Sequence, residues 1–522
     1  MKLKNIAFPV FAAVALMTSC IDDETNYGGD KIPTITVDVP ETAEGELPQV
    51  NFNYGEEAII EPGISYDGSG ELSYEWSVGS YNNGVKGPLE VVGTERRFTY
   101  FFPQGGSYYA HLKITDGTVG YVQEYQVNIN RSFEQGYLIL SSDRDGNGNI
   151  VFIKDLTPEE KEDGKTNLIT ENCLERINPH FEKEPIVGAA IMRFSWPSDI
   201  TRVLLTCESK AIYLDPNTFT AIATINYGDL ISGFKADRLI PAAATTMVYD
   251  SGMKRYLTIR GEDMIAMESS AMIGHVYDAT FFGSYYAWGN QNFEVYYVNR
   301  SPLEINSSSG YFGWLDDKNL VDDDGYGIFK NHELVNIFMG KTSQYYYESP
   351  YGNGYADYHP CDVISRNTVT GKYYSVRLRG FGSQDSEIVN MGRGEMAVTE
   401  NTAIPTTEGP VAVAETYDRV YYHIGNRVYA MIYQNNTYVL PDKNQYCLSY
   451  PEDETVTYMT VNVNTDDLIV ATVSKSTGRG NVYIYPVADV RSNNPDTAPV
   501  NEYKNCADHI SYIIYKPRVA NL

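Results

Sequence analysis

The sequence has little positive charge and no apolar run long enough to cross a membrane. Its 522 residues include 40 Lys and Arg against 68 Asp and Glu, which gives a formal net charge of -28. A nucleic-acid-binding surface needs clustered basic side chains to neutralise phosphates, and the sequence contains no basic stripe. Nucleic acid is therefore excluded as a partner, and the acidic balance favours solubility.

Cysteine is also scarce. Of the six cysteines, one lies at position 20 and the other five are widely separated, without the spacing of a zinc knuckle. An odd number of thiols allows at most two disulfides and leaves one thiol free. Disulfide bonds therefore do not build this fold. The five are Cys173, Cys207, Cys361, Cys447 and Cys506.

Short catalytic motifs are missing as well. There is no Gly-x-Ser-x-Gly elbow and no His-Glu-x-x-His, and the Gly-Lys-Thr runs at 164–166 and 340–342 lack the upstream glycine of a phosphate loop. The seven histidines are scattered singly, whereas acid-base catalysis needs partners within hydrogen-bond reach. We predict no catalytic residue, no metal ligand and no cofactor.

Alternating oxygen-bearing side chains between Asp143 and Asn149 resemble the first half of a calcium loop. The twelfth position, where a bidentate Glu closes the shell, is Lys154. A tight hairpin turn is the preferred interpretation, and the acidic run at 322–325 is interpreted in the same way.

The N-terminus has the layout of a signal peptide. Lys2 and Lys4 precede an apolar run that ends in Thr18 and Ser19, directly before Cys20. This run is shorter than the roughly 20 residues of a membrane span. The segment resembles a bacterial lipobox, although Met17 stands where that pattern prefers Leu. The resemblance implies a signal peptide over residues 1–19 and lipid attachment to Cys20, so the chain is tethered to a membrane only by its lipid. The alternative is an ordinary secretory signal.

An acidic cluster, Asp22, Asp23 and Glu24, follows the cysteine. It resembles the export signal of surface lipoproteins in gut bacteria that use SusC/SusD-type nutrient importers, which implies the outer membrane and the cell exterior. A hydrated acidic linker is the alternative. Residues 20–31 are expected to form a flexible tether.

The rest of the chain has the pattern of an all-β protein. Its 44 tyrosines and many β-branched residues fall in short runs separated by Gly, Asn and Asp. Convincing amphipathic helices are few, and one short helical turn is expected within residues 158–165.

Residues 32–131 have the pattern of one small sandwich. Strand-like alternation occurs at 74–78 and at 97–102, and the segment 103–117 combines a Pro-Gly turn, an alternating strand and Thr-Asp-Gly. This layout resembles the closing hairpin of a PKD domain, an immunoglobulin-like fold, and implies that Trp76 is its core tryptophan. The Gly-Asp-Gly that usually follows that tryptophan is missing.

Residues 132–522 repeat a unit of strand, turn and Tyr-rich strand. Serial hairpins must hide their edges, which radial blades around a channel achieve. We predict a β-propeller of about seven or eight blades, with a double sandwich or a jelly roll as the alternative. The run at 211–218 is expected to belong to the outer hairpin of a blade. Other expected strands are 137–141, 149–154, 202–206, 412–414, 419–424, 427–433, 467–473 and 481–486.

Aromatic residues concentrate within 285–288, 311–314 and 345–359. Consecutive tyrosines on a strand point to opposite faces, so about half of each run is free to contact sugar rings or an extended peptide. The alternative for any single tyrosine is packing between blades. The candidate ligand-binding residues are Trp288, Trp314, Tyr351 and Tyr355.

As a whole, the chain resembles the PKD-like family of surface lipoproteins, which pair a lipobox and a PKD-like domain with a long β region. The resemblance implies a non-catalytic accessory subunit of a SusC/SusD-type importer, acting with other surface lipoproteins on oligopeptides or glycans. Two alternatives remain: a surface glycan hydrolase or lyase with dispersed carboxylates on the propeller, and a structural adhesin.

Overall fold

The computed structural model describes two compact units. One runs to Ile129 and the other begins at Asn130, with residues 53–55 assigned to the second. The described residues are 32–39, 42, 47–53, 57–82, 85–102, 106–130, 133–162, 169–178, 180–194, 200–240, 245–268, 279–287, 290–311, 314–320, 327–347, 354–358, 360–379, 387–407, 409–492 and 494–519. Cys20, Asp22, Asp23 and Glu24 lie outside them, as do residues 322–325.

The first unit is made of antiparallel strands. Strands β2, β10, β9, β5 and β6 lie in one sheet, with β7 also paired to β5, while β1 pairs with β4 and β3 with β8. The strands are β1 (Ile35–Asp38), β2 (Gln49–Asn53), β3 (Ala58–Ile60), β4 (Gly63–Tyr66), β5 (Ser73–Asn82), β6 (Val85–Lys86), β7 (Glu90–Gly93), β8 (Phe98–Tyr100), β9 (Gly106–Thr115) and β10 (Gly120–Asn130).

Trp76 forms the centre of this unit's core, as predicted. Its side chain is fully buried, its ring lies 4.9 Å from that of Phe98 and 6.0 Å from that of Tyr125, and its Nε1 donates a hydrogen bond to the carbonyl of Glu95. The expected closing hairpin is also present, because β9 and β10 pair across a turn at residues 116–119. The Asp116 carboxylate accepts the backbone N–H groups of Thr118 and Val119 in that turn.

The second unit consists of consecutive antiparallel groups of four strands. Their orders are β13-β12-β11-β41, β14 to β17, β18 to β21, β22 to β25, β26-β29-β30-β31, β32 to β35 and β37 to β40. A short parallel pairing of β25 with β31 joins two of these groups into one sheet of eight strands. Strands β27 and β28 form a separate hairpin between β26 and β29, and β36 pairs with β34.

The bounds of the second unit's elements are β11 (Gly136–Ser142), β12 (Gly148–Lys154), α1 (Pro158–Glu162), β13 (Ile169–Thr170), α2 (Cys173–Ile177), β14 (Ile186–Phe194), β15 (Ile200–Cys207), β16 (Lys210–Leu214), β17 (Ala221–Asn226), β18 (Arg238–Ile240), β19 (Thr245–Asp250), β20 (Arg255–Arg260), β21 (Ile265–Glu268), β22 (Ala279–Ala287), β23 (Asn290–Arg300), β24 (Leu303–Tyr311), β25 (Trp314–Leu320), β26 (His332–Met339), β27 (Ser343–Tyr347), β28 (Gly354–Tyr358), β29 (Cys361–Asn367), β30 (Tyr373–Arg379), β31 (Glu387–Met396), β32 (Val411–Ala414), β33 (Arg419–Ile424), β34 (Arg427–Gln434), β35 (Thr437–Val439), β36 (Leu448–Ser449), β37 (Glu454–Asn462), β38 (Asp467–Ser474), β39 (Gly480–Pro486), β40 (Asn501–Ala507) and β41 (His509–Lys516).

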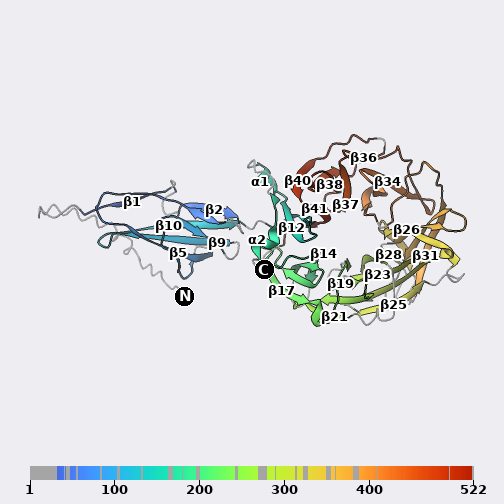
Figure 1. Ribbon diagram of the computed structural model, residues 1–522, viewed down its shortest axis with the longest axis horizontal. Helices are drawn as coiled ribbons and strands as arrows, with labels where there is room; N and C mark the ends of the chain where they lie inside the picture. Colours follow the sequence, from blue (N-terminus) through green and yellow to red (C-terminus); the bar gives the residue numbers. More distant parts are fainter. Residues whose placement is uncertain are drawn as a thin grey trace, which may run out of the picture. The chain divides into compact units, whose positions relative to one another are not determined.

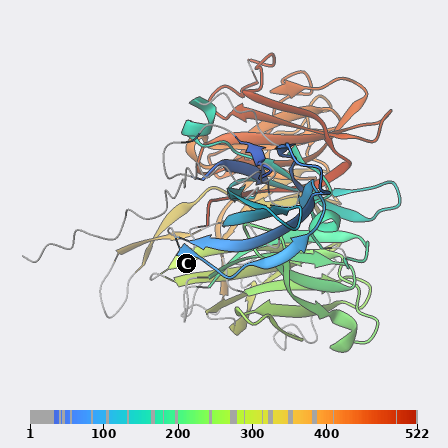
Figure 2. The same cartoon turned by 90° about the vertical axis from the view of Figure 1, so that its left-hand side faces the viewer.

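Successive sheets of this unit pack face to face. Each of six buried apolar clusters draws its residues from two neighbouring groups of four strands; Leu140 and Leu205, for example, share one cluster, and Phe338 and Met431 share another. The sheets follow one another around a ring in Figure 1, and Figure 2 shows them from the side, green strands at the bottom and orange strands at the top. This is the arrangement of a β-propeller. It differs from a double sandwich or jelly roll because nearly every group of four strands is consecutive in the chain; the exceptions are the closing strand β41 and the hairpin β27–β28 inserted between β26 and β29.

The C-terminal strand closes the ring. Strand β41 pairs with β11, near the start of the unit, over most of its length, and a shared apolar cluster packs Ile513 with Ile139 and Ile469 of the last sheet. Pairing the first and last strands of this unit in one sheet hides the edges that an open series of hairpins would expose.

Several local predictions are confirmed. The run at 211–218 includes most of β16 and the turn to β17, the outer hairpin of its sheet, and β33 has the expected bounds of residues 419–424. The segment after Asp143 is a hairpin turn, in which the Asp143 carboxylate accepts the backbone N–H groups of Asp145 and Asn147.

All five described cysteines are buried and unbridged. No helix among the described residues is long and apolar enough to span a membrane.

A buried lysine lies at the ring closure. Lys516, at the end of β41, has no exposed side-chain surface, and its Nζ donates hydrogen bonds to the carbonyls of Glu134 at 2.6 Å and Pro517 at 3.3 Å. Burial lowers the pKa of this ammonium group to about 8. Because an exposed lysine has a pKa of about 10.4, the unfolded chain binds more protons between these two values.

We expect this lysine to make the unit more stable as the pH rises. Linkage gives a gain of about 2 kcal/mol in the free energy of unfolding between pH 7 and 9.5, from this group alone. Urea titrations of the wild type and Lys516→Met should therefore show a stability difference that grows with pH by that amount. Lys504→Met, which removes a lysine with an exposed side chain, is the control. If the free energy of unfolding varies with pH in the same way in the wild type and in Lys516→Met, the lowered pKa assigned to Lys516 is wrong.

Candidate functional site

Two pairs of strand ends lie at one edge of the sheet formed by β22 to β25. Strands β22 and β23 meet at the pair Ala287 and Asn290, and β24 and β25 meet at Tyr311 and Trp314. Because β22 to β25 are antiparallel in order, both strand ends lie at the same edge of the sheet. Strand β28 of the inserted hairpin packs beside β22. The hairpin is therefore a neighbour of this sheet.

The base of the inserted hairpin binds the next sheet. Lys341 Nζ forms an ion pair with Asp418 Oδ1 at 2.6 Å, and the backbone N–H of Thr342 donates to Glu415 Oε2 at 2.9 Å. Glu415 and Asp418 belong to the connection between β32 and β33. These contacts fix the start of β27 against a neighbouring sheet.

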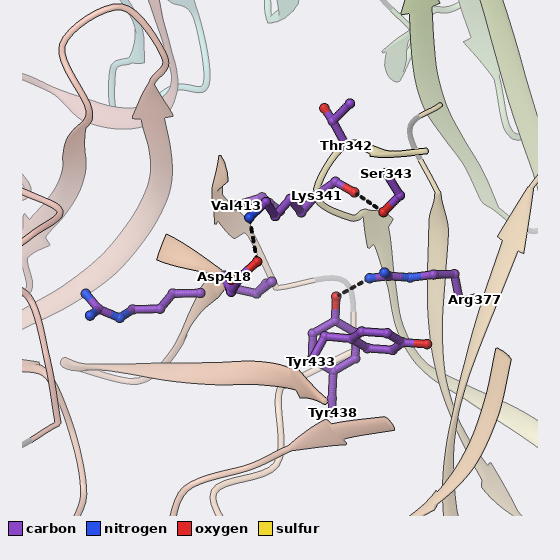
Figure 3. A pocket seen from close by; sticks show the side chains of 10 residues that line it. Lys341, Thr342, Ser343, Arg377, Val413, Asp418, Tyr433 and Tyr438 are labelled. Carbon is purple, nitrogen blue, oxygen red and sulfur yellow. Dashed lines mark hydrogen bonds and ion pairs between the residues drawn. The ribbon is translucent and has the colours of Figure 1, made fainter. Parts of the chain in front are cut away.

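A small cavity of about 170 Å³ opens at this junction. Figure 3 shows Lys341 and Asp418 on one side of it, with Arg377 and Tyr433 on the other. Strands β27, β30, β32, β33, β34 and β35 contribute to it, so two adjacent sheets and the hairpin base form its wall. Its lining residues are Lys341, Thr342, Ser343, Arg377, Val413, Asp418, Arg419, Val420, Tyr433 and Tyr438.

Arg377 is held rigidly in the wall of the cavity. Its Nε and Nη2 donate to the two carboxylate oxygens of Asp362 at 2.8 and 2.7 Å, and its guanidinium lies 3.6 Å from the centre of the Tyr433 ring. Burial acts to lower the pKa of Arg377, but the hydrogen bonds and negative charge of Asp362 outweigh it and raise that pKa. The guanidinium therefore stays charged.

Tyr438 completes this network from the neighbouring sheet. Its hydroxyl donates to Asp362 Oδ2 at 2.6 Å, and it accepts a weaker contact from Arg377 Nη2 at 3.4 Å. Burial and, next, the charge of Asp362 raise the pKa of Tyr438 well above its usual value, so its hydroxyl stays protonated. The side chain of Asp362 is only 1% exposed. The buried carboxylate is thus paired with a cation and with a hydroxyl from a second sheet, as a buried charge must be.

The four predicted ligand-binding aromatics are not brought together by described contacts. Trp288 and Tyr351 lie outside the described residues. Trp314 is the first residue of β25, and Tyr355 pairs with Tyr346 in the β27–β28 hairpin. Their assignment as ligand contacts stays a prediction.

Many other tyrosines pack inside the ring, as the alternative interpretation held. Tyr213, Tyr421, Tyr422 and Tyr438 are almost fully buried, and each belongs to a cluster shared by two sheets. The described residues contain no group of three or more His, Cys, Asp or Glu placed to hold a metal ion.

Asp362 and Arg377 were not predicted as site residues, and Lys341 was considered only in the Gly-Lys-Thr run that lacks a phosphate loop's upstream glycine. The one available signal was a charged residue inside an apolar strand: Asp362 stands between Cys361 and Val363 in β29. Such a residue must find a partner when buried, but the partner lies on another strand whose register the sequence does not specify.

No protein-family model matches the sequence, and no curated protein matches it. Among solved structures, a quinonprotein alcohol dehydrogenase-like protein from Bacteroides thetaiotaomicron aligns over 92% of this chain and 99% of its own, at 12% identity and a TM-score of 0.47. AztD from Citrobacter koseri aligns over 74% and 100%, at 7% identity and a TM-score of 0.33. The dihydro-heme d1 dehydrogenase NirN aligns over 73% and 75%, at 10% identity and a TM-score of 0.34. These likenesses are too distant to bear on function, and the propeller assignment rests on strand pairing and sheet packing.

Proposed function

We propose that this chain is a lipid-anchored protein of the outer membrane, facing the cell exterior, that binds oligopeptides or glycans as a non-catalytic subunit of a SusC/SusD-type uptake system. In this proposal Cys20 carries the lipid, residues 22–24 direct export, and the first unit is a PKD-like domain. The second unit is a seven-bladed propeller, one blade for each consecutive group of four strands.

The observation that carries the binding role is the cavity beside the inserted hairpin. Its charged groups are held in place by structural partners: Arg377 by Asp362, and Lys341 by Asp418. Fixed polar groups beside aromatic rings are the features by which proteins orient a bound ligand. A general acid or base would instead need a group free to exchange a proton with substrate, and these charges are committed to ion pairs.

Isolation of the protein from its native membrane tests this role. A tagged chain, solubilised in mild detergent from cells grown on peptides or on a host or plant glycan, should bring with it a SusC/SusD-type pair. The same tag on an unrelated surface lipoprotein is the control. If the importer never accompanies the chain, the accessory role is wrong. Turnover of a polysaccharide by the purified protein would favour the hydrolase or lyase, and matrix binding without an importer would favour the adhesin.

A further inference from the structure

The Arg377 guanidinium lines the cavity with part of its donor capacity unused. Its Nε and Nη2 donate to Asp362, and Nη2 also contacts the Tyr438 hydroxyl, whereas Nη1 has no hydrogen-bond partner among the residues that the structure describes. The side chain is 11% exposed and belongs to the cavity lining. A charged group with unused N–H donors is thus held at the cavity in a fixed orientation.

Two further cations line the same cavity. Lys341 uses one of its three ammonium donors on Asp418, and Arg419 donates Nη1 to the carbonyls of Val487 and Val490. Three of the ten lining side chains are cationic and one is anionic, in a protein whose formal charge is -28. Because the protein as a whole repels anions, a cavity with this lining is a local exception.

The charges at the cavity favour a small anionic group over a cation. Arg377 and Lys341 are each paired with one carboxylate, Asp362 and Asp418, whereas Arg419 donates to backbone carbonyls. Glu415 lies beside the lining, where it accepts the backbone N–H of Thr342.

The size of the cavity suits an end group. At about 170 Å³ it is smaller than the roughly 300–1,000 Å³ of sites that enclose a whole ligand of drug size. A carboxylate is small and planar, and it accepts charge-assisted hydrogen bonds from guanidinium and ammonium groups. The fixed side chain of Arg377 also reduces the entropy lost on binding.

We propose that this cavity binds the carboxylate of the captured nutrient, with Arg377 Nη1 and Lys341 Nζ as donors. The inference rests on the proposed binding function and names its ligand chemistry. The carboxylate comes either from the C-terminus of a peptide or from a uronic acid in a glycan. In both cases the remainder of the ligand extends from the cavity towards the inserted hairpin, whose described Tyr346 side chain is 52% exposed.

Calorimetry with small probes tests the proposal on the full-length protein. Tri-alanine and its C-terminal amide form one matched pair, and glucuronic acid and glucose form the other. The acid of at least one pair should bind about tenfold more tightly than its neutral partner, the effect of one charge-assisted hydrogen bond. The pair that shows the difference identifies the source. Equal binding of acid and neutral probes, or no binding of either acid at millimolar concentration, would overturn the inference.

A lysine variant distinguishes the cavity from other sites. Lys341→Gln removes a donor whose side chain is 37% exposed and whose partner Asp418 is 66% exposed, so the fold should persist, and the favoured acid should bind about tenfold more weakly. Lys372→Gln is the matched control, because Lys372 forms a similarly exposed ion pair with Glu395 outside the cavity. Equal affinity in the wild type and Lys341→Gln would overturn the assignment. If the importer does not co-purify with the protein but the acid still binds, the uptake role is wrong and the carboxylate site is still supported.

Discussion

Replacing Asp362 by Leu is expected to lower the free energy of unfolding of the propeller unit by about 3–5 kcal/mol, because it leaves the charge of Arg377 buried without a partner. Asp362 is almost fully buried and receives three hydrogen bonds, two from Arg377 and one from Tyr438. Tyr438 lies in β35 and Asp362 in β29, so the network joins two sheets as well as two side chains. Urea unfolding followed by circular dichroism measures the loss.

Two further variants distinguish the effect of an unpaired buried charge from the general effect of a substitution. Asp362→Leu combined with Arg377→Met removes both charges and should recover at least half of the loss, since an apolar pair of similar volume replaces an ion pair at little cost. Glu333→Ala removes a carboxylate from the exposed ion pair with Arg366 in the same sheet, and it should cost no more than about 1 kcal/mol. An Asp362→Leu effect as small as that of Glu333→Ala, or a double variant no more stable than the single one, would contradict the account.

Replacing Cys20 by Ala is expected to move most of the protein out of the membrane fraction. A single acyl chain gives only marginal binding, whereas several together anchor firmly at about 0.8 kcal/mol for each buried methylene. Fractionation of cells followed by immunoblotting measures the change.

The acidic cluster provides the matched control for this variant. Replacing Asp22 and Asp23 by Asn and Glu24 by Gln retains the cysteine and should leave the protein in the membrane fraction. The same change should reduce its digestion by protease added to intact cells if these residues direct export to the surface. A Cys20→Ala protein that sediments with the membrane as before would show that something other than lipid holds it there.

Local elements were predictable from the sequence because each depends on residues close together in the chain. Alternation and a following turn sufficed for β33 and β34, and the Asx-rich segment after Asp143 sufficed for a hairpin turn. Trp76 was predicted as a core residue through the resemblance of residues 103–117 to the closing hairpin of a PKD domain, and its ring lies against Phe98 and Tyr125. The serial hairpins then required a ring, since an open series would expose its edges.

The candidate site was not predictable, for an equally physical reason. Asp362, Arg377 and Tyr438 meet only because β29 pairs with β30 in one register and because the next sheet packs on both. Lys341 reaches Asp418 across 77 positions of sequence. The residues next to them in the sequence do not indicate that they meet in the fold. The aromatic runs were singled out because they are local in the sequence. In the structure, tyrosines such as Tyr421, Tyr422 and Tyr438 pack between neighbouring sheets.

Lipid attached to Cys20 is central to the proposed function, and incorporation of labelled palmitate measures it. Cells that express the wild-type chain should yield a labelled band, and the band should disappear in Cys20→Ala while the protein is still made. A wild-type chain without label, or a Cys20→Ala chain that retains it, would contradict the proposal that this propeller protein is tethered outside the cell by a lipid.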